Sequence, residues 1–251
     1  MFTDKGDNLM KRSVGRGMEL WSGHVGGYTA EDMARIVEAT TRSYVEWGLF
    51  GDFPMDNEIE WRKLVSEMAE GFDELRLVVS LWKREKWLGG VMGVLGKSDK
   101  PVKKLIGKRG AFLPTLAALR FEGEDKLLNL PERQMACFVR FGRLPDKYWS
   151  DEEREFLPSF TKVVLGELVR LIDWHNRQGG EVRGVILDTH DSKLVTMLIR
   201  RYAGRLISRM AEPTPQVLPP NILSWHYQRL RPAVVGFDFD IMLAGVNKGA
   251  R

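Results

Sequence analysis

The sequence predicts a mixed α/β (α+β) fold, in which one central sheet is flanked by helices. Short runs with the two-residue period of strands alternate along the chain with longer runs that have helical spacing. Their order is helix, helix, hairpin, strand, helix, strand, helix, strand. The chain has 251 residues, of which 43% are hydrophobic, so it holds enough apolar material for one sizeable core.

One domain with an N-terminal arm is expected. Residues 1–16 are polar and glycine-rich, which predicts a flexible arm. Residues 17–251 then form a single domain. Residues 97–132 combine basic, turn-rich sequence with apolar patches of no steady period, which indicates an insertion or a covering segment within that domain.

Two helices and a hairpin are predicted before this insertion. Thr29 and Asp32 have the spacing of a capping box and begin a helix that ends near Gly48. A second helix is predicted over residues 57–68, and alternation around a polar tetrad predicts an antiparallel hairpin over residues 75–95. The second strand of this hairpin carries three glycines that indicate a bulge or the close approach of another segment: Gly89, Gly90 and Gly93.

A βαβ unit is predicted after the insertion. Residues 133–143 alternate as a strand, and Ser150 with Glu153 forms a capping box at the start of a long amphipathic helix. Pro158 lies inside the helical pattern and predicts a break there. Residues 182–188 read as a buried strand, so the two strands that the helix connects should be parallel.

Further elements are predicted toward the C-terminus. Apolar spacing predicts a helix over residues 192–203, and residues 205–210 are consistent with a strand. Residues 233–243 alternate weakly, which fits a last strand or a surface segment.

A polar bend, residues 188–192, separates the buried strand from the helix that follows it. It lies past the carboxyl end of a central strand, where open α/β sheets bind ligands. Asp188 or His190 would be able to accept a proton there. Asp191 or Ser192 would also serve as an ordinary helix cap, so both interpretations of the bend stay open.

Several classes of site are not expected from the composition. The four histidines lie far apart, so we expect no zinc or other metal site. Cys137 is the single cysteine and lies mid-strand among apolar residues, which predicts a buried core thiol and a reducing, cytoplasmic environment. No apolar run is long enough for a membrane span, and the N-terminus is too polar for a secretory signal peptide.

Common catalytic motifs are also missing from the sequence. There is no phosphate-binding loop, no dinucleotide fingerprint and no Gly-x-Ser-x-Gly elbow. The net charge of +4 fits an acidic or phosphate-bearing partner, or simply a mildly basic surface. Nucleic acid is not the expected partner, because aromatic residues do not interleave with the basic ones.

The most informative segment is Val139–Pro145. A strand carries Arg140 and Arg143, leaves through a glycine and a proline, and leads into a capped helix. If this strand separates from its neighbour here, unpaired backbone groups can bind an extended ligand, and the helix N-terminus favours an anion. The alternative is an edge strand with solvated arginines.

The order of elements and the segment "FVRFGRL" together resemble the GNAT acyltransferase fold, over about residues 30–225. The segment looks like the W-E-x-x-R-L/F strand of acyl-homoserine-lactone synthases and of long-chain N-acyl amino acid synthases. The resemblance implies a GNAT-like sheet with a splayed strand pair. It also implies transfer of a fatty acyl group from an acyl carrier protein or CoA thioester to a small amine, such as an amino acid derivative, with no permanently bound cofactor.

Three departures from the family pattern affect this expectation. The pyrophosphate loop of members that use acetyl-CoA is missing from "GRLPDKYWSDEER", which counts against a plain acetyl-CoA donor and is compatible with the carrier-protein families. Arg140 stands where the relatives have a glutamate. Arg200 stands where a tyrosine often precedes the closing glycine, and Tyr202 is two residues away from that position.

The resemblance assigns roles to particular residues. Asp188, His190 and Arg140 are the candidate catalytic residues. The oxyanion and the pantetheine arm are expected to bind the backbone at Phe141, Gly142, Arg143 and Leu144. Arg200 and Arg201 are expected to meet the phosphate of phosphopantetheine or the acidic helices of a carrier protein. Because Arg140 replaces an acid, a catalytically inactive GNAT-like domain that binds an acyl group or a partner protein is the alternative.

Overall fold

A mixed eight-stranded sheet forms the centre of the computed structural model, which describes residues 9–46, 54–72, 76–97, 135–189, 192–209 and 233–248. Within these ranges the strand order is β1-β2-β3-β4-β5-β6-β8-β7. Neighbouring strands are antiparallel except β5 and β6, which are parallel. The strands are β1 Met10–Gly15, β2 Met18–His24, β3 Leu77–Lys83, β4 Lys86–Lys97, β5 Met135–Arg143, β6 Val182–Thr189, β7 Arg205–Arg209 and β8 Ala233–Asp238.

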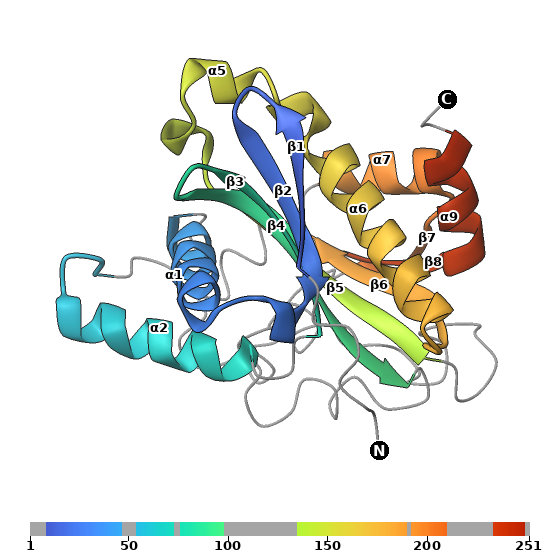
Figure 1. Ribbon diagram of the computed structural model, residues 1–251, viewed down its shortest axis with the longest axis horizontal. Helices are drawn as coiled ribbons and strands as arrows, with labels where there is room; N and C mark the ends of the chain where they lie inside the picture. The colour runs from blue at the N-terminus through green and yellow to red at the C-terminus, as the bar shows by residue number, and fades with distance from the viewer. Residues whose placement is uncertain are drawn as a thin grey trace.

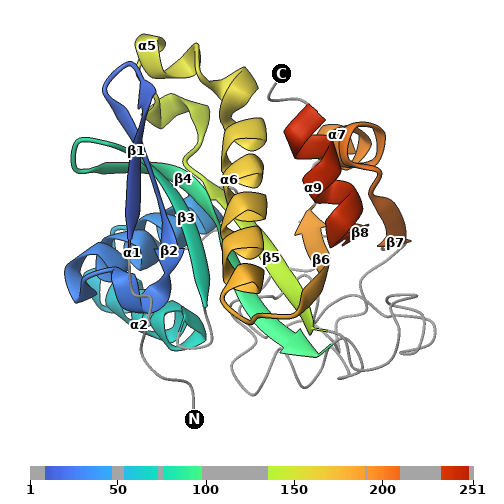
Figure 2. The same cartoon turned by 45° about the vertical axis from the view of Figure 1, so that its right-hand side comes forward.

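Helices cover both faces of this sheet (Figure 1). One face carries α1 and α2, and the other carries α6, α9 and α7, with α9 between the other two (Figure 2). The helices are α1 Ala30–Glu46, α2 Glu58–Phe72, α5 Asp151–Arg154, α6 Leu157–Arg177, α7 Ser192–Tyr202 and α9 Phe239–Lys248, with short 3₁₀ turns η1 Val25–Gly27 and η3 Asp146–Tyr148. None of the helices in the described ranges is both long and apolar enough to cross a bilayer.

Local signals that predicted the helix ends are confirmed. The Thr29 hydroxyl accepts the backbone N–H of Asp32 at 3.0 Å and donates to its carboxylate at 2.8 Å, so α1 begins at the predicted cap. The capping box of Ser150 and Glu153 begins α5. The expected break follows, because α6 begins at Leu157 and places Pro158 in its first turn, where no N–H is needed.

The predicted hairpin and βαβ unit are also confirmed. Strands β3 and β4 pair antiparallel, and their register shifts between Leu81 and Trp82, which is the bulge that the glycines indicated. A Cβ at Gly90 would lie 2.2 Å from the carbonyl oxygen of Val79, so glycine is required for this close approach. The connection from β5 through α6 to β6 gives the parallel pair.

Two predictions about the ends of the chain are corrected. Residues 10–15 of the expected arm form β1, which pairs with β2, and neither strand was predicted. Residues 1–8 lie outside the described ranges. The last segment is a strand only to Asp238, whose carboxylate accepts the N–H groups of Asp240 and Ile241 at 3.0 and 3.3 Å and so begins α9. The predicted insertion near 97–132 lies almost wholly outside the described residues.

The core between the sheet and α6 is apolar. Cys137 is fully buried in it, and burial raises the pKa of its thiol to about 12, as expected for a core thiol. The sheet side of α6 contributes a stripe that is fully buried: Val164, Leu165, Leu168, Val169, Leu171 and Ile172.

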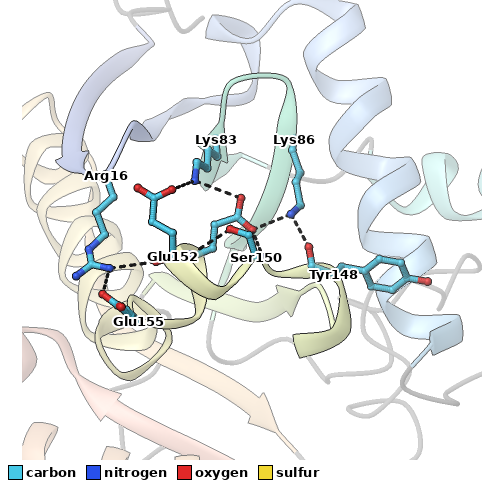
Figure 3. Close-up of polar contacts among 8 residues, drawn as sticks. Arg16, Lys83, Lys86, Tyr148, Ser150, Glu152 and Glu155 are labelled. Carbon is cyan, nitrogen blue, oxygen red and sulfur yellow. Dashed lines mark hydrogen bonds and ion pairs between the residues drawn. The ribbon is translucent and has the colours of Figure 1, made fainter.

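Ion pairs from two hairpin tips hold α5 beside the exit of β5 (Figure 3). Lys83 and Lys86, at the tip between β3 and β4, contact Glu152 and Glu153 at 2.7 and 2.8 Å. Lys86 also donates to the carbonyl oxygen of Tyr148. Arg16, in the turn between β1 and β2, donates to the carbonyl oxygen of Glu152 at 3.1 Å. These contacts fix the segment that follows β5.

Glu153 makes this network sensitive to pH. Its side chain is 5% exposed. Although burial acts to raise the pKa of Glu153, hydrogen bonds from Lys86 and from the Ser150 N–H hold that pKa below its ordinary value. A carboxyl whose pKa is lower in the folded than in the unfolded chain stabilises the fold above its unfolded pKa, and this contribution is lost as the pH falls through the folded value.

We predict that Glu153→Gln lowers the free energy of unfolding by about 1 kcal/mol at pH 7, because the charged hydrogen bonds weaken. The difference from wild type should shrink as the pH falls below the ordinary glutamate pKa of about 4.3 and toward the lower pKa of the folded chain, because the contribution of the carboxylate is lost over that range. Urea unfolding at pH 7 and pH 3.5 measures both values. Glu155→Gln is the control, because that side chain is 65% exposed and should cost less. An equal penalty for Glu153→Gln at both pH values would contradict the account.

Candidate functional site

The sheet opens between β5 and β6. Their ladder ends at the pair Val139–Leu187, whereas β5 continues beside β4 as far as the pair Arg143–Gly89. Beyond Leu187, β6 remains paired with β8 as far as Thr189. We call the diverging ends, residues 140–143 of β5 and 188–189 of β6, the strand fork. The splayed strand pair that the sequence predicted is therefore present at the expected place.

One edge of β5 faces the fork. Alternate residues of a strand direct their backbone N–H and C=O groups to opposite edges. The N–H of Leu144 donates to Leu88 of β4 at 3.0 Å, so the backbone groups of Leu144 and Gly142 are directed to β4. The groups of Phe141 and Arg143 are directed the other way, into the fork. Within the described part of the ladder, β6 provides no partner for Phe141.

The predicted backbone site is therefore smaller than the sequence suggested. Leu144 donates its N–H to Leu88, and its carbonyl oxygen accepts the indole N–H of Trp149 at 2.9 Å, so both groups are already used. Gly142 contributes its small size rather than its N–H. The carbonyl oxygen of Arg143 accepts the Ser43 hydroxyl at 2.5 Å. The N–H of Phe141 is the clearest remaining donor.

Helix α1 runs along the open end of β5. Thr40, Ser43 and Glu46 are three residues apart, so each lies about 4.5 Å further along the helix axis than the one before. The methyl group of Thr40 lies 3.5 Å from where a Cβ would be at Gly142. The Ser43 hydroxyl donates a hydrogen bond to the carbonyl oxygen of Arg143. Glu46 therefore comes next along the same face. Sequence analysis did not identify these three residues as site residues.

Glu46 forms a cluster with the segment that leaves β5. The Tyr148 hydroxyl donates to its carboxylate, and the Lys147 ammonium contacts the other oxygen at 2.5 Å. Although partial burial acts to raise the pKa of Glu46, the hydrogen bonds from Lys147 and Tyr148 hold it below its ordinary value. The same hydrogen bond from Tyr148, and then burial, raise the pKa of the phenol. Glu46 is 102 residues away from Tyr148, so no local pattern reveals the pair.

Two buried polar atoms beside Gly142 have no hydrogen-bond partner among the described residues. They are Thr40 Oγ1 and Trp87 Nε1, and both side chains are almost completely buried. The indole ring of Trp87 comes within 3.1 Å of where a Cβ would be at Gly142. A buried polar group that makes no hydrogen bond costs about 1–3 kcal/mol, and such groups are rare in folded proteins.

The predicted catalytic residues fall on the two branches of the fork as far as they are described. Arg140 is the first residue of β5, and Asp188 the first of β6, beyond the last pair that joins the two strands. His190 lies outside the described residues, as does Asp191. The structure therefore brings the backbone of Arg140 and Asp188 to the same opening.

The predicted phosphate-binding arginines lie on the last turn of α7. Arg200 and Arg201 are both exposed. Arg201 lines a cleft of about 620 Å³ over the outer side of α6. Three further cations line this cleft: Arg12, Lys162 and Arg170. Arg12 and Arg170 both contact the carboxylate of Glu167, at 2.9 and 3.3 Å, so one acidic group offsets part of this charge.

The start of α5 is not built as a phosphate site. Its first turn carries Asp151, Glu152 and Glu153, and its N-terminal N–H groups are capped by the Ser150 and Glu153 side chains. Four acidic side chains lie at this start, Asp146 on the preceding turn and Asp151, Glu152 and Glu153 in α5, and each has a cationic partner: Arg143, Arg154, Lys83 and Lys86. The capping bonds leave fewer free N–H groups for an anion at this helix start.

A second cavity, of about 840 Å³, lies between α1 and α2. The α1 residues that line it are not those that border the fork. They are Ala30, Met33, Ala34, Val37 and Glu38. No group of three or more His, Cys, Asp or Glu side chains in the described ranges is placed to hold a metal ion.

Comparison with solved structures shows what this arrangement resembles. The C-terminal condensation domain of Ebony, in complex with β-alanyl-dopamine, is 12% identical over 88% of this chain and 98% of that chain, with a TM-score of 0.51. The Drosophila melanogaster polyamine N-acetyltransferase, which forms N-acetylagmatine, is 12% identical over 87% and 98%, with a TM-score of 0.48. RimL, the ribosomal L7/L12 α-N-protein acetyltransferase in complex with coenzyme A, is 10% identical over 92% and 99%, with a TM-score of 0.46.

At such low identity these comparisons show the fold alone. No protein-family model matches the chain, and no curated protein matches its sequence significantly. None of the three structures above is an acyl-homoserine-lactone synthase or an N-acyl amino acid synthase. The fold itself is a mixed α+β fold, as the sequence predicted.

We predict that Tyr148→Phe raises the pKa of Glu46 toward its ordinary value, because one of the two hydrogen bonds that stabilise the carboxylate is lost. A carbon-detected NMR titration of the Glu46 carboxyl would measure the change. Tyr202→Phe is the control, since that tyrosine lies on α7 and is not among the groups that act on the Glu46 carboxylate. An unchanged Glu46 titration in Tyr148→Phe would show that the phenol does not stabilise the carboxylate.

Proposed function

We propose that this protein is an N-acyltransferase that moves a fatty acyl group from a phosphopantetheine thioester to a small amine. The observation that carries this proposal is the strand fork, where β5 keeps its bonds to β4 but not to β6. An extended pantetheine arm has amide groups at intervals along its length. It therefore pairs with the open edge of β5 in the way that an added strand would.

The proposed chemistry is direct transfer. The amine nitrogen attacks the thioester carbonyl carbon, the C–S bond of the tetrahedral intermediate breaks, and the products are an amide and a thiol. The backbone N–H of Phe141 stabilises the oxyanion. One proton leaves the attacking nitrogen and one proton reaches the departing thiolate, so the reaction needs a proton acceptor but no redox partner.

Three residues are proposed for the proton transfer. Asp188 begins the free part of β6, and His190 follows it in the sequence. Glu46 is a third candidate, because α1 places it one turn beyond Ser43 on the face that borders the fork. Arg140 cannot act as a base, since its guanidinium stays protonated. We assign it the stabilisation of negative charge in the transition state.

The donor is proposed to be an acyl carrier protein, with acyl-CoA as the second choice. The Ser150 and Glu153 side chains already cap the start of α5, which leaves fewer N–H groups there for a pyrophosphate. The exposed Arg200 and Arg201, with the basic cleft of Arg12, Lys162 and Arg170, suit an acidic protein surface. Acyl-CoA stays the alternative donor because it carries the same pantetheine arm.

A second function is favoured by one specific feature. Arg140 stands on β5 where the relatives that the sequence resembles have a glutamate. If no other residue replaces that acid, the protein is a binding domain that holds an acyl group or a partner protein without turnover. Thioester binding without release of free thiol would identify this case.

We predict thiol release when the protein is mixed with acyl-carrier thioesters and a panel of small amines, and slower release with the matching acyl-CoA. A thiol-reactive dye measures both rates. Absence of turnover with every acyl length and amine would count against the enzyme, and binding without turnover would select the second function.

We also predict that Phe141→Pro lowers the transfer rate at least about 100-fold, because proline lacks the N–H that faces the fork. The pairing of β5 with β4 should survive, since the Phe141 N–H is directed away from β4. Phe141→Leu is the matched control, because it loses the ring but keeps the N–H. Equal rates for the two variants, with both folded, would contradict this role.

A further inference from the structure

Among the described residues, Thr40 and Trp87 are the exceptions to a general pattern in which buried hydroxyl and indole groups have hydrogen-bond partners. Thr41, the neighbour of Thr40 in α1, donates its hydroxyl to the carbonyl oxygen of Val37 at 2.7 Å. Trp82, at the position of β3 opposite Trp87, donates its indole N–H to Ser80 at 2.8 Å. Thr40 and Trp87 make no such bond, and among the described residues they are the buried side chains with unpartnered polar atoms.

These two side chains come from different elements but pack against the same residue, Gly142. Thr40 lies on α1 and Trp87 on β4, and both contact the position that a side chain at Gly142 would occupy. Any residue larger than glycine at position 142 would crowd the indole, at 3.1 Å. Gly142 belongs to the part of β5 that β6 leaves uncovered. The two side chains that carry the unpartnered atoms therefore both contact a residue of the strand fork.

The chemistry of the two atoms defines the group that would satisfy them. An indole nitrogen only donates, and a hydroxyl donates or accepts. Two donors in a buried, uncharged environment suit a neutral acceptor oxygen, because an ion would lose its hydration without a counter-charge. A carbonyl oxygen fits this description. The pantetheine arm of a thioester donor carries two amide carbonyl groups.

We propose that Thr40 and Trp87 form a subsite that binds an amide carbonyl oxygen of the donor's pantetheine arm. This inference rests on the proposed function, since the arm reaches Gly142 only if it lies in the strand fork. The subsite sets affinity for the donor rather than the rate of bond formation, because it lies beside the arm and not at the reacting carbon.

The test uses decyl-pantetheine, a thioether that keeps both amides but cannot react. We expect Thr40→Val and Trp87→Phe each to weaken its binding about tenfold in isothermal titration. Thr40→Val should also leave the Tm unchanged or raise it by about 2–4 °C, since the hydroxyl it removes makes no bond in the free protein. The combination of equal or higher stability with weaker binding is not expected from a side chain that only packs.

Matched controls separate the subsite from packing effects. Thr41→Val removes a hydroxyl that does have a partner, so it should lower the Tm without weakening binding. Trp82→Phe makes the same change in ring size as Trp87→Phe on the neighbouring strand. If Thr41→Val or Trp82→Phe weakened binding as much as the subsite variants, the effect would be one of packing, and the inference would be wrong.

The outcomes also separate this inference from the proposed function. If wild type binds the probe and Thr40→Val and Trp87→Phe bind it equally well, the subsite is refuted while the transferase proposal stands. If wild type does not bind the probe at any concentration up to 1 mM (roughly the weakest affinity expected for a specific ligand), both are refuted. Binding that weakens only in the two subsite variants supports the assignment.

Discussion

The pairing of β5 with β4 is the interaction on which the rest of the site depends. It continues for four residues after β6 has left, and so it holds one edge of β5 straight while the other edge has no strand beside it. In the interior of a sheet an uncovered edge would normally be closed by the next strand. Here β6 is held away by its own pairing with β8 as far as Thr189. Helix α1 supports the open end through the Ser43 contact with Arg143, and α5 is held in place by the lysines of the β3–β4 tip.

This arrangement gives up stability at the opening. The N–H of Phe141 has no strand partner in the described ladder, and Thr40 and Trp87 keep buried polar atoms without hydrogen bonds. Sites that bind or transform a ligand commonly carry such unsatisfied or strained groups, because the ligand completes them. Contacts elsewhere in the same region offset part of this cost: Lys86 donates to the buried Glu153 carboxylate, and the Trp149 indole donates to the carbonyl oxygen of Leu144. Stability and binding should therefore change in opposite directions when these groups are removed.

Local sequence signals predicted the elements that depend on neighbouring residues. The caps at Thr29 and Ser150, the bulge in β4 and the parallel βαβ unit all follow from spacing within one or two elements. Strand β1 was missed because its residues are mostly exposed and do not alternate between apolar and polar. Its pairing with β2, which the sequence does not reveal, is what makes it a strand. The fork itself was predicted from the glycine and proline after Arg140. Contacts such as Glu46 with Tyr148 join residues that are 102 positions apart, and only the folded chain brings them together. For the same reason the sequence could not show that both backbone groups of Leu144 are used within the protein.

The most direct measurement of the central claim is amide hydrogen exchange along β5, followed by NMR with and without decyl-pantetheine. The account predicts that in the free protein the Phe141 amide exchanges much faster than the amides of Gly142 and Leu144, which are directed to β4. Saturation with the thioether should slow exchange at Phe141 at least about tenfold and leave the other two unchanged. If the Phe141 amide is already as protected as that of Gly142 in the free protein, or if the thioether leaves it unprotected, the strand fork is not where the donor binds.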